Sequence, residues 1–518
     1  MKPENIPSSP WPPLACQLGP TTLQRTVPVP DGNYSGPSLT LVTCLCIKLV
    51  HLCALLLGTA ALLLPAVAQS PPASPSRPAN ILLIVGDDIG YADLGFNGCR
   101  DIPTPHLDAL AASGVRFTNG YVTGPYCSPT RAALLTGRYQ NRFGHEFNPS
   151  GPAAGMPVTE STLADRLKAA GYTTGLVGKW HLGSASGMLP QQRGFDEFFG
   201  FLGGAHSYTK ANGILRGTTP VTELDYTTDA FAREAASFIN RHRATPWMLY
   251  LAFNAVHTPL QATGERLSKL AGIKDPKRRT YAAMMLALDD AIGTVLNQLR
   301  ATGQEGHTLV CFISDNGGPA MKGVTVNGAI NTPLRGGKRT TLEGGIRVPF
   351  LISWPGKIKP AVFEKPVIQL DLHATALAAA GLSLKTEWKL EGVNLLPLLD
   401  ESSTPAPHDA LYWRFGNQMA VRSGDFKLVR YDLKADTAVL ERRKLNQGVS
   451  EARLYNLELD IGENNDLAAA QPEKVRELQA LWDTWNQHNL PPLAGASPER
   501  GNRVRAQRKK ERRAAAVP

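Results

Sequence analysis

A cysteine stands where a helix is expected to begin, at the start of the run Cys-Ser-Pro-Thr-Arg over residues 127–131. Ser128 is a good N-cap, Pro129 suits the first helical position, and helix-forming residues 132–138 follow. Orphan backbone N–H groups and the helix dipole favour negative charge at such a terminus. The pattern predicts an anion-docking site at Cys127, with a buried cysteine at a helix start as the ordinary alternative.

Oxygen-bearing side chains follow two apolar runs, residues 81–85 and 309–314, which read as buried parallel strands. They are Asp87, Asp88, Asp315 and Asn316. Three carboxylates and an amide oxygen suit Ca²⁺ or Mg²⁺ better than zinc, which prefers histidine and cysteine. The alternative is that these residues only initiate turns before glycine.

Basic side chains follow two further apolar runs. Lys179 and His181 lie two residues apart, so both point the same way if the extended strand from residue 173 continues through them. His257 follows the run 247–254, and Lys338 ends a glycine-rich stretch. In open α/β sheets ligands bind outside the carboxyl ends of the strands, which is where these groups would collect. For each histidine alone, an ordinary surface or core position is the alternative.

The elements that must position these residues change in character along the chain. Up to about residue 400, strands alternate with helical segments such as 161–170 and 281–299, which predicts an α/β fold with a large mixed, mostly parallel sheet between helices. After the linker 395–407, short strands and one helix predict a smaller antiparallel subdomain. Its expected strands are 410–414, 419–422, 427–431 and 453–457, and its helix is 473–488.

Over about residues 79–490 the chain resembles the formylglycine-dependent (type I) sulfatase family of the alkaline phosphatase superfamily. Cys-x-Pro-x-Arg followed by Ala-Ala-Leu-Leu-Thr-Gly-Arg is similar to the family's modification motif, and residues 171–181 are similar to its second conserved segment. The resemblance implies a catalytic domain over 79–400, a C-terminal subdomain over 408–490, and conversion of Cys127 to formylglycine (3-oxoalanine). The Ca²⁺ ligands that it implies, with Mg²⁺ as the alternative ion, are Asp87, Asp88, Asp315, Asn316 and residue 127.

The resemblance also implies roles in the reaction. One hydroxyl of the hydrated aldehyde would attack sulfur, and the other would later expel the bound sulfate. Asp315 would help to deprotonate the hydrate, and Arg131 would pair with its oxygens. Lys179 and Lys338 would hold the sulfate with the metal ion, because fixed cations stabilise charge that develops on the transferring group.

Two histidines complete the implied machinery. His257 with Lys338 would protonate the leaving alcohol, and His181 would withdraw the proton that collapses the hemiacetal. His206 lies in segment 203–207, which is similar to one that lines the family's sulfate pocket; a loop histidine without such a role is the alternative. The predicted substrate-binding residues are Lys179, His257, Lys338 and His206.

The function implied is hydrolysis of a sulfate monoester, from a carbohydrate or aryl sulfate, by a sulfuric ester hydrolase. The alternatives are a phosphodiesterase or phosphonate monoester hydrolase of the same superfamily, or a non-catalytic protein that binds a sulfated glycan. The implied partners are a sulfated small molecule or glycan and, during maturation, the formylglycine-generating enzyme. No nucleic-acid partner is expected.

Residues 1–68 are interpreted as a signal region. The apolar stretch 49–68 follows Lys48 and ends in Ala-Val-Ala, which predicts cleavage near Gln69 and a periplasmic or secreted protein without a membrane span in its mature form. A retained membrane anchor is the alternative. The Pro, Ser and Thr content before this stretch is unusual for a signal peptide and favours a misassigned start codon.

Cysteine usage and charge agree with export. Four of the seven cysteines lie within residues 1–68, and the remaining Cys99, Cys127 and Cys311 are too few for a disulfide framework, although a Cys99–Cys311 bridge stays open. Residues 498–518 hold eight basic residues against two acidic ones, so most of the net charge of +10 is local. This tail is expected to be disordered, with docking on a polyanion as the alternative.

Overall fold

The structure is a computed structural model that describes residues 77–149, 151, 154–320, 326–399, 405–435 and 448–493. The predicted signal region 1–68, its cleavage point and the basic tail 498–518 lie outside these ranges. No helix within them is long and apolar enough to cross a membrane. The predicted boundary between the two domains also falls beside undescribed residues, 400–404, and the domain limits stay a prediction.

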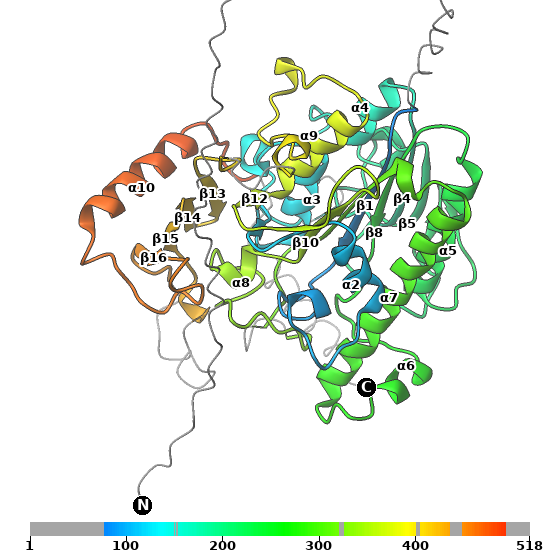
Figure 1. Ribbon diagram of the computed structural model, residues 1–518, viewed down its shortest axis with the longest axis horizontal. Coiled ribbons are helices and arrows are strands. Elements are labelled where there is room, and N and C mark those ends of the chain that lie inside the picture. The colour runs from blue at the N-terminus through cyan, green and yellow to red at the C-terminus, as the bar shows by residue number, and fades with distance from the viewer. Residues whose placement is uncertain are drawn as a thin grey trace, which may run out of the picture. The chain divides into compact units, whose positions relative to one another are not determined.

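A ten-stranded mixed sheet forms the centre of the fold (Figure 1). Its order is β11 (Ala361–Phe363), β2 (Val115–Phe117), β10 (Phe350–Ser353), β9 (Thr308–Ser314), β1 (Asn80–Gly86), β8 (Trp247–Ala252), β4 (Thr173–Lys179), β5 (Glu197–Phe201), β6 (Leu215–Arg216) and β7 (Thr219–Pro220). The five strands from β9 to β5 are parallel, and β10 is antiparallel to β9. Because Gly86 pairs with Ser314, β1 and β9 end at the same level, and the residues that follow them, Asp87 and Asp315, lie side by side.

Helices cover both faces of this sheet. Leu82 and Ile84 of β1 pack in the core that includes α2 (Pro105–Ala112), α5 (Thr227–Arg241) and α7 (Pro276–Ala301). The alternate residues of β1 pack with α3 (Cys127–Thr136), α4 (Leu163–Ala169) and α9 (Gln369–Ala379). Burial on both faces explains why the strands read as continuous apolar runs, with each fully buried Leu or Ile contributing about 1.5–3 kcal/mol. In Figure 1, α5 and α7 run side by side along the sheet. The predicted α/β fold class is confirmed.

The long helix α7 begins five residues earlier than the predicted 281–299. Asp275 is its N-cap and accepts a hydrogen bond from the Arg278 N–H at 2.6 Å, and Pro276 occupies the first turn. Both are ordinary helix-start signals, so this boundary was readable in the sequence. Helix α6 (Gly264–Lys269) contacts α7.

A second, antiparallel sheet of four strands follows, as predicted. It contains β13 (Leu411–Phe415), β14 (Gln418–Ser423), β15 (Phe426–Arg430) and β16 (Arg453–Asn456). Helix α10 (Pro472–Asn486) covers one face, where Val421 and Leu428 pack with Leu478. The other face packs against the larger part of the fold, and the Trp413 indole donates a hydrogen bond to the Val122 carbonyl at 2.7 Å.

A buried charge cluster also joins the two sheets. Lys427 of β15 lies 2.8 Å from Glu343 of α8 (Glu343–Ile346) and 2.9 Å from Glu463, and the three side chains are fully buried. Removing one partner of such a cluster would leave an uncompensated buried charge, at a cost of about 3–5 kcal/mol. The cluster therefore fixes α8, and with it the preceding loop that carries Lys338.

The remaining elements are short. The two-stranded sheet consists of β3 (Gly120–Tyr121) and β12 (Val367–Ile368). The 3₁₀ helices are η1 (Gly95–Asn97), η2 (Gln140–Phe143), η3 (Pro190–Gln192), η4 (Glu305–His307), η5 (Thr386–Trp388), η6 (Leu396–Leu398) and η7 (Leu433–Ala435). Cys99, Cys127 and Cys311 are free thiols, so the Cys99–Cys311 bridge left open by the sequence is not formed.

We expect stability to fall in mild acid because of His373 in α9. Burial, with the nearby Arg166, lowers the pKa of His373 to about 3, and its ring contacts the Leu134 carbonyl and the Arg166 guanidinium. The unfolded chain binds a proton there near pH 6.5 and the folded chain does not, so stability present above that pH is lost as the pH falls. Between pH 6.5 and 5 the loss from this group is about 2 kcal/mol.

Urea denaturation at the two pH values would measure this loss. In His373→Gln, which cannot titrate, the drop in unfolding free energy between pH 6.5 and 5 should be smaller by about that amount. Parallel pH dependences for wild type and variant would contradict the assignment.

Candidate active site

The predicted acidic residues converge at the carboxyl ends of β1 and β9. One ligand atom from each of Asp87, Asp88, Cys127 and Asp315 lies within 4.8 Å of the others, and all four residues are buried. The backbone holds this arrangement, because the Asp315 N–H donates to the Gly86 carbonyl at 3.0 Å. The structure thus brings together groups from three separate segments of the sequence.

Cys127 lies at the centre of the cluster. Its side chain is 1% exposed, its sulfur is 3.1 Å from Lys338 Nζ, and it is 3.8 Å from Asp87 Oδ1. Burial raises the pKa of this thiol to about 12, despite the nearby Lys179 and Lys338. At neutral pH the sulfur is therefore protonated, and the cysteine itself is a poor nucleophile.

The start of α3 differs from the prediction. The helix begins at Cys127, Tyr126 is the N-cap residue without a side-chain capping bond, and Ser128 lies inside the first turn. Because Ser128 lies inside the helix it does not act as the N-cap, and its hydroxyl instead donates to the His181 carbonyl at 2.7 Å. Ser128 Oγ is also 2.7 Å from His145 Nε2, and burial lowers the pKa of His145 to about 4. His145 is therefore neutral. Sequence reasoning missed this residue, which no motif marks.

Three cations neutralise the three carboxylates. Lys179 Nζ lies 2.5 Å from Asp87 Oδ2, and Lys338 Nζ lies 2.6 Å from Asp88 Oδ1. Arg131 donates from Nε and Nη2 to Asp315 Oδ2, at 3.0 and 2.8 Å.

The carboxylates differ in their proton affinity. Burial tends to raise the pKa of Asp87, but Lys179 and the other basic side chains around it outweigh burial and hold this pKa below its ordinary value. Burial and the neighbouring Asp87 raise the pKa of Asp315 to about 6, although Arg131 opposes them. Asp315 is thus the carboxylate in this pair that takes up a proton more readily.

The donor set fits a hard divalent ion. Asn316 Nδ2 donates to Asp88 Oδ1 at 2.8 Å, whereas Asn316 Oδ1 is buried without a hydrogen-bond partner in the described part of the chain. An orphaned buried oxygen is unfavourable by about 1–3 kcal/mol unless something binds it. Together with carboxylates of Asp87, Asp88 and Asp315, this amide oxygen supplies the kind of ligand that Ca²⁺ and Mg²⁺ prefer.

His181 reaches the cluster by a route that differs from the prediction. The extended conformation does not continue beyond Lys179, because His181 has a φ of +60° in the left-handed region. Its Nδ1 is buried without a hydrogen-bond partner. Burial, then Lys179 and Arg131, keep its pKa well below the ordinary value, so the ring is neutral. The expectation that Lys179 and His181 point the same way along one extended strand is therefore not the reason why both lie near the cluster.

His257 lies beside Asp88, with 3.7 Å between Nε2 and Asp88 Oδ2. Its Nδ1 contacts the Thr258 carbonyl at 2.6 Å, which assigns the proton of the neutral ring to Nδ1 and leaves Nε2 facing the cluster. Burial lowers the pKa of His257, while Asp87 and Asp88 act in the opposite direction.

His206 is the one predicted site residue that the described contacts do not join to the cluster. Its ring nitrogens lie 2.6 Å from the Ser207 carbonyl and 2.9 Å from the Asn212 carbonyl, within its own loop. The same loop nevertheless approaches the site, because a Cβ at Gly204 would stand 2.5 Å from His181 Nε2. The role of His206 in substrate binding stays a prediction.

Asn254 is a second residue that sequence reasoning missed. It follows β8, is 1% exposed, and neither atom of its side-chain amide has a hydrogen-bond partner. Its backbone carbonyl accepts hydrogen bonds from Tyr208 Oη at 2.5 Å and from the His257 N–H at 2.8 Å. The sequence did contain a signal for Asn254, because this residue, like Asn316, carries a side-chain amide at the end of an apolar run.

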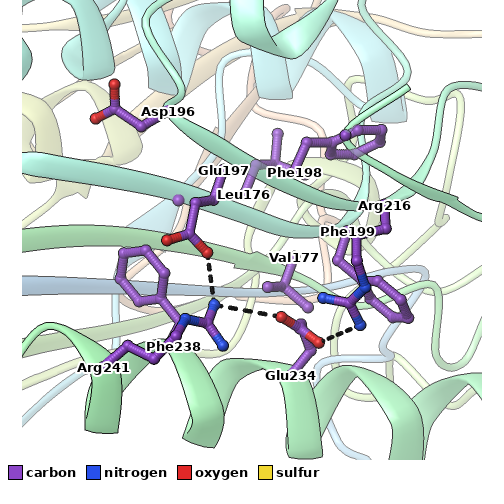
Figure 2. Close-up of a pocket in the computed structure, with 12 residues that line it drawn as sticks. Leu176, Val177, Asp196, Glu197, Phe198, Phe199, Arg216, Glu234, Phe238 and Arg241 are labelled. Atoms are coloured by element: carbon purple, nitrogen blue, oxygen red, sulfur yellow. Dashed lines mark hydrogen bonds and ion pairs between the residues drawn. The ribbon is translucent and has the colours of Figure 1, made fainter. Parts of the chain in front are cut away.

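A cavity of about 370 Å³ lies elsewhere, along β4 and β5 (Figure 2). Its two arginines pair with its two glutamates: Arg241 lies 2.5 Å from Glu197 and 3.4 Å from Glu234, and Arg216 lies 2.7 Å from Glu234. The residues that line this cavity include no cysteine or serine that could act as a nucleophile and no histidine. We therefore place the candidate active site at the Cys127 cluster.

Comparisons with known proteins agree with this geometry. A family model described as sulfatase matches residues 79–382, which is more than half of the chain. A second model, described as N-sulphoglucosamine sulphohydrolase, C-terminal, matches residues 337–474. Both models include Lys338, and the first includes all the other clustered residues.

Individual relatives match over most of the chain. Arylsulfatase A from Bos taurus is 35% identical over 455 residues, which cover 78% of this chain and 87% of that protein. N-acetylgalactosamine-6-sulfatase from Sus scrofa is 35% identical over 381 residues, covering 68% of this chain and 71% of that protein. The crystal structure of Ps i-CgsB in complex with k-i-k-neocarrahexaose is 35% identical with a TM-score of 0.74, covering 83% of this chain and 97% of that chain.

Proposed function

The chain belongs to the sulfatase family and is a sulfuric ester hydrolase, and we propose that it releases sulfate from a carbohydrate sulfate monoester by means of a formylglycine at position 127 and bound Ca²⁺. The family resemblance inferred from the motifs is thereby confirmed. The observation that carries the proposal is the convergence of Cys127 with three carboxylates and two lysines in one buried cluster.

The inert thiol supports the modification. A protonated, buried cysteine with a pKa near 12 has no evident task in ester hydrolysis, although its position is surrounded by catalytic types of side chain. An aldehyde at Cβ of residue 127, once hydrated, offers an oxygen nucleophile in place of the sulfur. Pro129 and Arg131 stand where the recognition motif of the modifying enzyme has them.

A divalent ion held by Asp87, Asp88, Asp315 and Asn316 would supply positive charge opposite the anionic ester. The orphaned Asn316 Oδ1 supports its presence. Ca²⁺ is preferred to Mg²⁺ because the set of clustered protein oxygens is large, whereas Mg²⁺ usually keeps several waters.

The side chains around the cluster divide the remaining work. Lys179 and Lys338 hold the sulfate, and each can exchange its present carboxylate partner for an anionic oxygen. Arg131 keeps Asp315 oriented through two hydrogen bonds, and Asp315 accepts a proton from the nucleophile. His257, once it has taken up a second proton at Nε2, would deliver that proton to the leaving alcohol, and His181 would withdraw one in the later step. A positioned acid or base of this kind contributes about 10²–10⁴-fold.

A carbohydrate substrate is supported by the relatives. One is named for a sulfated amino sugar, and another has been solved with a neocarrahexaose. Aryl sulfates are expected to serve as small chromogenic substrates. We also infer export to the periplasm or beyond, with the formylglycine-generating enzyme as a maturation partner, from the apolar stretch 49–68 and the Cys127 motif.

The reaction class can be tested with three substrates that share one leaving group: an aryl sulfate, an aryl phosphate diester and an aryl phosphonate monoester. We expect the highest kcat/KM for the sulfate. Charge alone does not decide this, since sulfate monoesters and phosphate diesters both carry one negative charge. A preference of more than about tenfold for either phosphorus ester, equal to ~1.4 kcal/mol of transition-state binding, would replace the sulfatase function by the alternative one.

A further inference from the structure

One arginine beside the cluster has no acidic partner among the residues that the structure describes. Arg339 follows Lys338 directly and is partly exposed, and no described residue forms a hydrogen bond or ion pair with its guanidinium. We propose that Arg339 is a specificity-determining residue that binds a second anionic group of the substrate. This inference rests on the proposed function, and it defines the substrate as a saccharide with more than one negative charge.

The position of Arg339 suits this role. Its Cζ lies 5.7 Å from the centroid of the Tyr126 ring, and Lys338 Nζ lies 5.6 Å from the same centroid. Tyr126 immediately precedes Cys127, and its ring is partly exposed. The guanidinium therefore contacts the residue next to Cys127, and both Arg339 and Tyr126 are partly exposed to solvent.

The charge balance of the site also points to an anion at Arg339. Lys338 is neutralised by Asp88, at 2.6 Å, whereas the only described partner of the Arg339 guanidinium is an aromatic ring. A cation–π contact compensates a charge weakly where water remains nearby.

The backbone holds Arg339 in a fixed and unusual conformation. Its φ is +77°, which side chains other than glycine rarely adopt. Its N–H donates to the Pro125 carbonyl at 2.8 Å, and its carbonyl accepts from Gln418 Nε2 at 3.0 Å. Gln418 Oε1 in turn accepts from the Thr341 and Asp432 N–H groups at 3.3 and 3.1 Å. Strained residues held this firmly cluster at ligand sites.

The chemistry of these groups defines the ligand. The planar guanidinium presents paired donors that match the oxygens of a sulfate or a carboxylate. Tyr126, braced by the edge of Phe415 at 5.7 Å between centroids, offers an apolar ring face beside those donors. A saccharide with a sulfate ester on one carbon and a second sulfate or a carboxylate nearby presents both features together.

The test measures inhibition of 4-nitrophenyl sulfate hydrolysis by the mature enzyme. The competitors are galactose 6-sulfate, galactose 4,6-disulfate, and N-acetylgalactosamine 6-sulfate linked to glucuronic acid. For the wild-type enzyme we expect at least one of the two doubly charged competitors to bind about tenfold more tightly than the singly charged one. Which of the two it is distinguishes a second sulfate from a carboxylate.

Arg339→Gln should reduce this selectivity to about twofold or less, and Arg339→Lys should retain part of it. Added salt should weaken the selectivity of the wild type more than that of Arg339→Gln. The matched control is Lys389→Gln, which removes a cation from another residue with positive φ, +51°, in an exposed position. This control should keep the wild-type selectivity.

Wild-type selectivity that is absent, or that survives in Arg339→Gln, would overturn the role of Arg339. The same holds if none of the three competitors inhibits while 4-nitrophenyl sulfate is hydrolysed. Failure of the mature protein to hydrolyse any aryl sulfate would instead count against the proposed function, so the two failures are distinguishable.

Discussion

Cys127→Ala is expected to fold normally and to lose sulfate-ester hydrolysis by about 10⁴-fold or more. The substitution leaves a methyl group that cannot be converted to the aldehyde, so no nucleophile forms, and residual rate enhancement can come only from binding and electrostatics. It deletes one buried sulfur, so the stability change should be about 1 kcal/mol. Release of 4-nitrophenol and the melting temperature would measure the two effects.

Cys311→Ala is the matched control, because Cys311 is another buried free thiol, in β9 and without a predicted role. It should retain activity. Mass spectrometry of the wild-type peptide that contains residue 127 should show a side chain that has lost its sulfur and gained an oxygen. An unmodified thiol in fully active enzyme would contradict the formylglycine proposal while leaving the rest of the site intact.

Asp88→Asn should lower both metal content and kcat by about 10²-fold or more, since the ion is expected to supply several kcal/mol of charge stabilisation. The change isolates charge from backbone effects. Asp88 has a φ of +65°, and asparagine is among the residues that tolerate this region. The hydrogen bond from Asn316 Nδ2 can also persist, because the variant keeps an amide oxygen.

Chelation of the wild type should reproduce the effect, lowering activity and melting temperature together, as expected when a ligand binds the folded state only. Ca²⁺ should restore both. Asp225→Asn, which alters an exposed carboxylate paired with Arg233, should behave as wild type. Restoration by Zn²⁺ but not by Ca²⁺ would contradict the oxygen-ligand assignment.

The sequence alone predicted the four central strands β1, β4, β8 and β9 and the four strands of the second sheet, and it placed the acidic side chains of the site together. Residues 81–85 and 309–314 are apolar because both faces of the sheet are covered, and parallel strands bring their ends to one edge. Asp87 and Asp315 could therefore be placed together without any knowledge of the structure. The same argument should have marked Asn254, which ends the run 247–254.

Features set by partners distant in the sequence could not be predicted in this way. Serine is a residue type that favours the N-cap position, but the Ser128 hydroxyl contacts His145 and the His181 carbonyl, which are 17 and 53 residues away. His181 leaves the extended conformation because the backbone turns after β4, which the alternation of residues does not reveal. The Glu343–Lys427–Glu463 cluster likewise has no local sequence signal, since its members approach one another only when the two sheets pack.

Helix α3 is buried along its whole length. Lys338, which covers the Cys127 sulfur, follows Cys127 by 211 residues in the sequence. At a synthesis rate of roughly 5–20 residues per second, these two residues emerge about 10–40 s apart. An enzyme that converts Cys127 must reach it on the growing or still unfolded chain, before Lys338 and the sheet close over the thiol. The pace of translation and folding, and not recognition of the finished protein, would then set what fraction of the molecules becomes active.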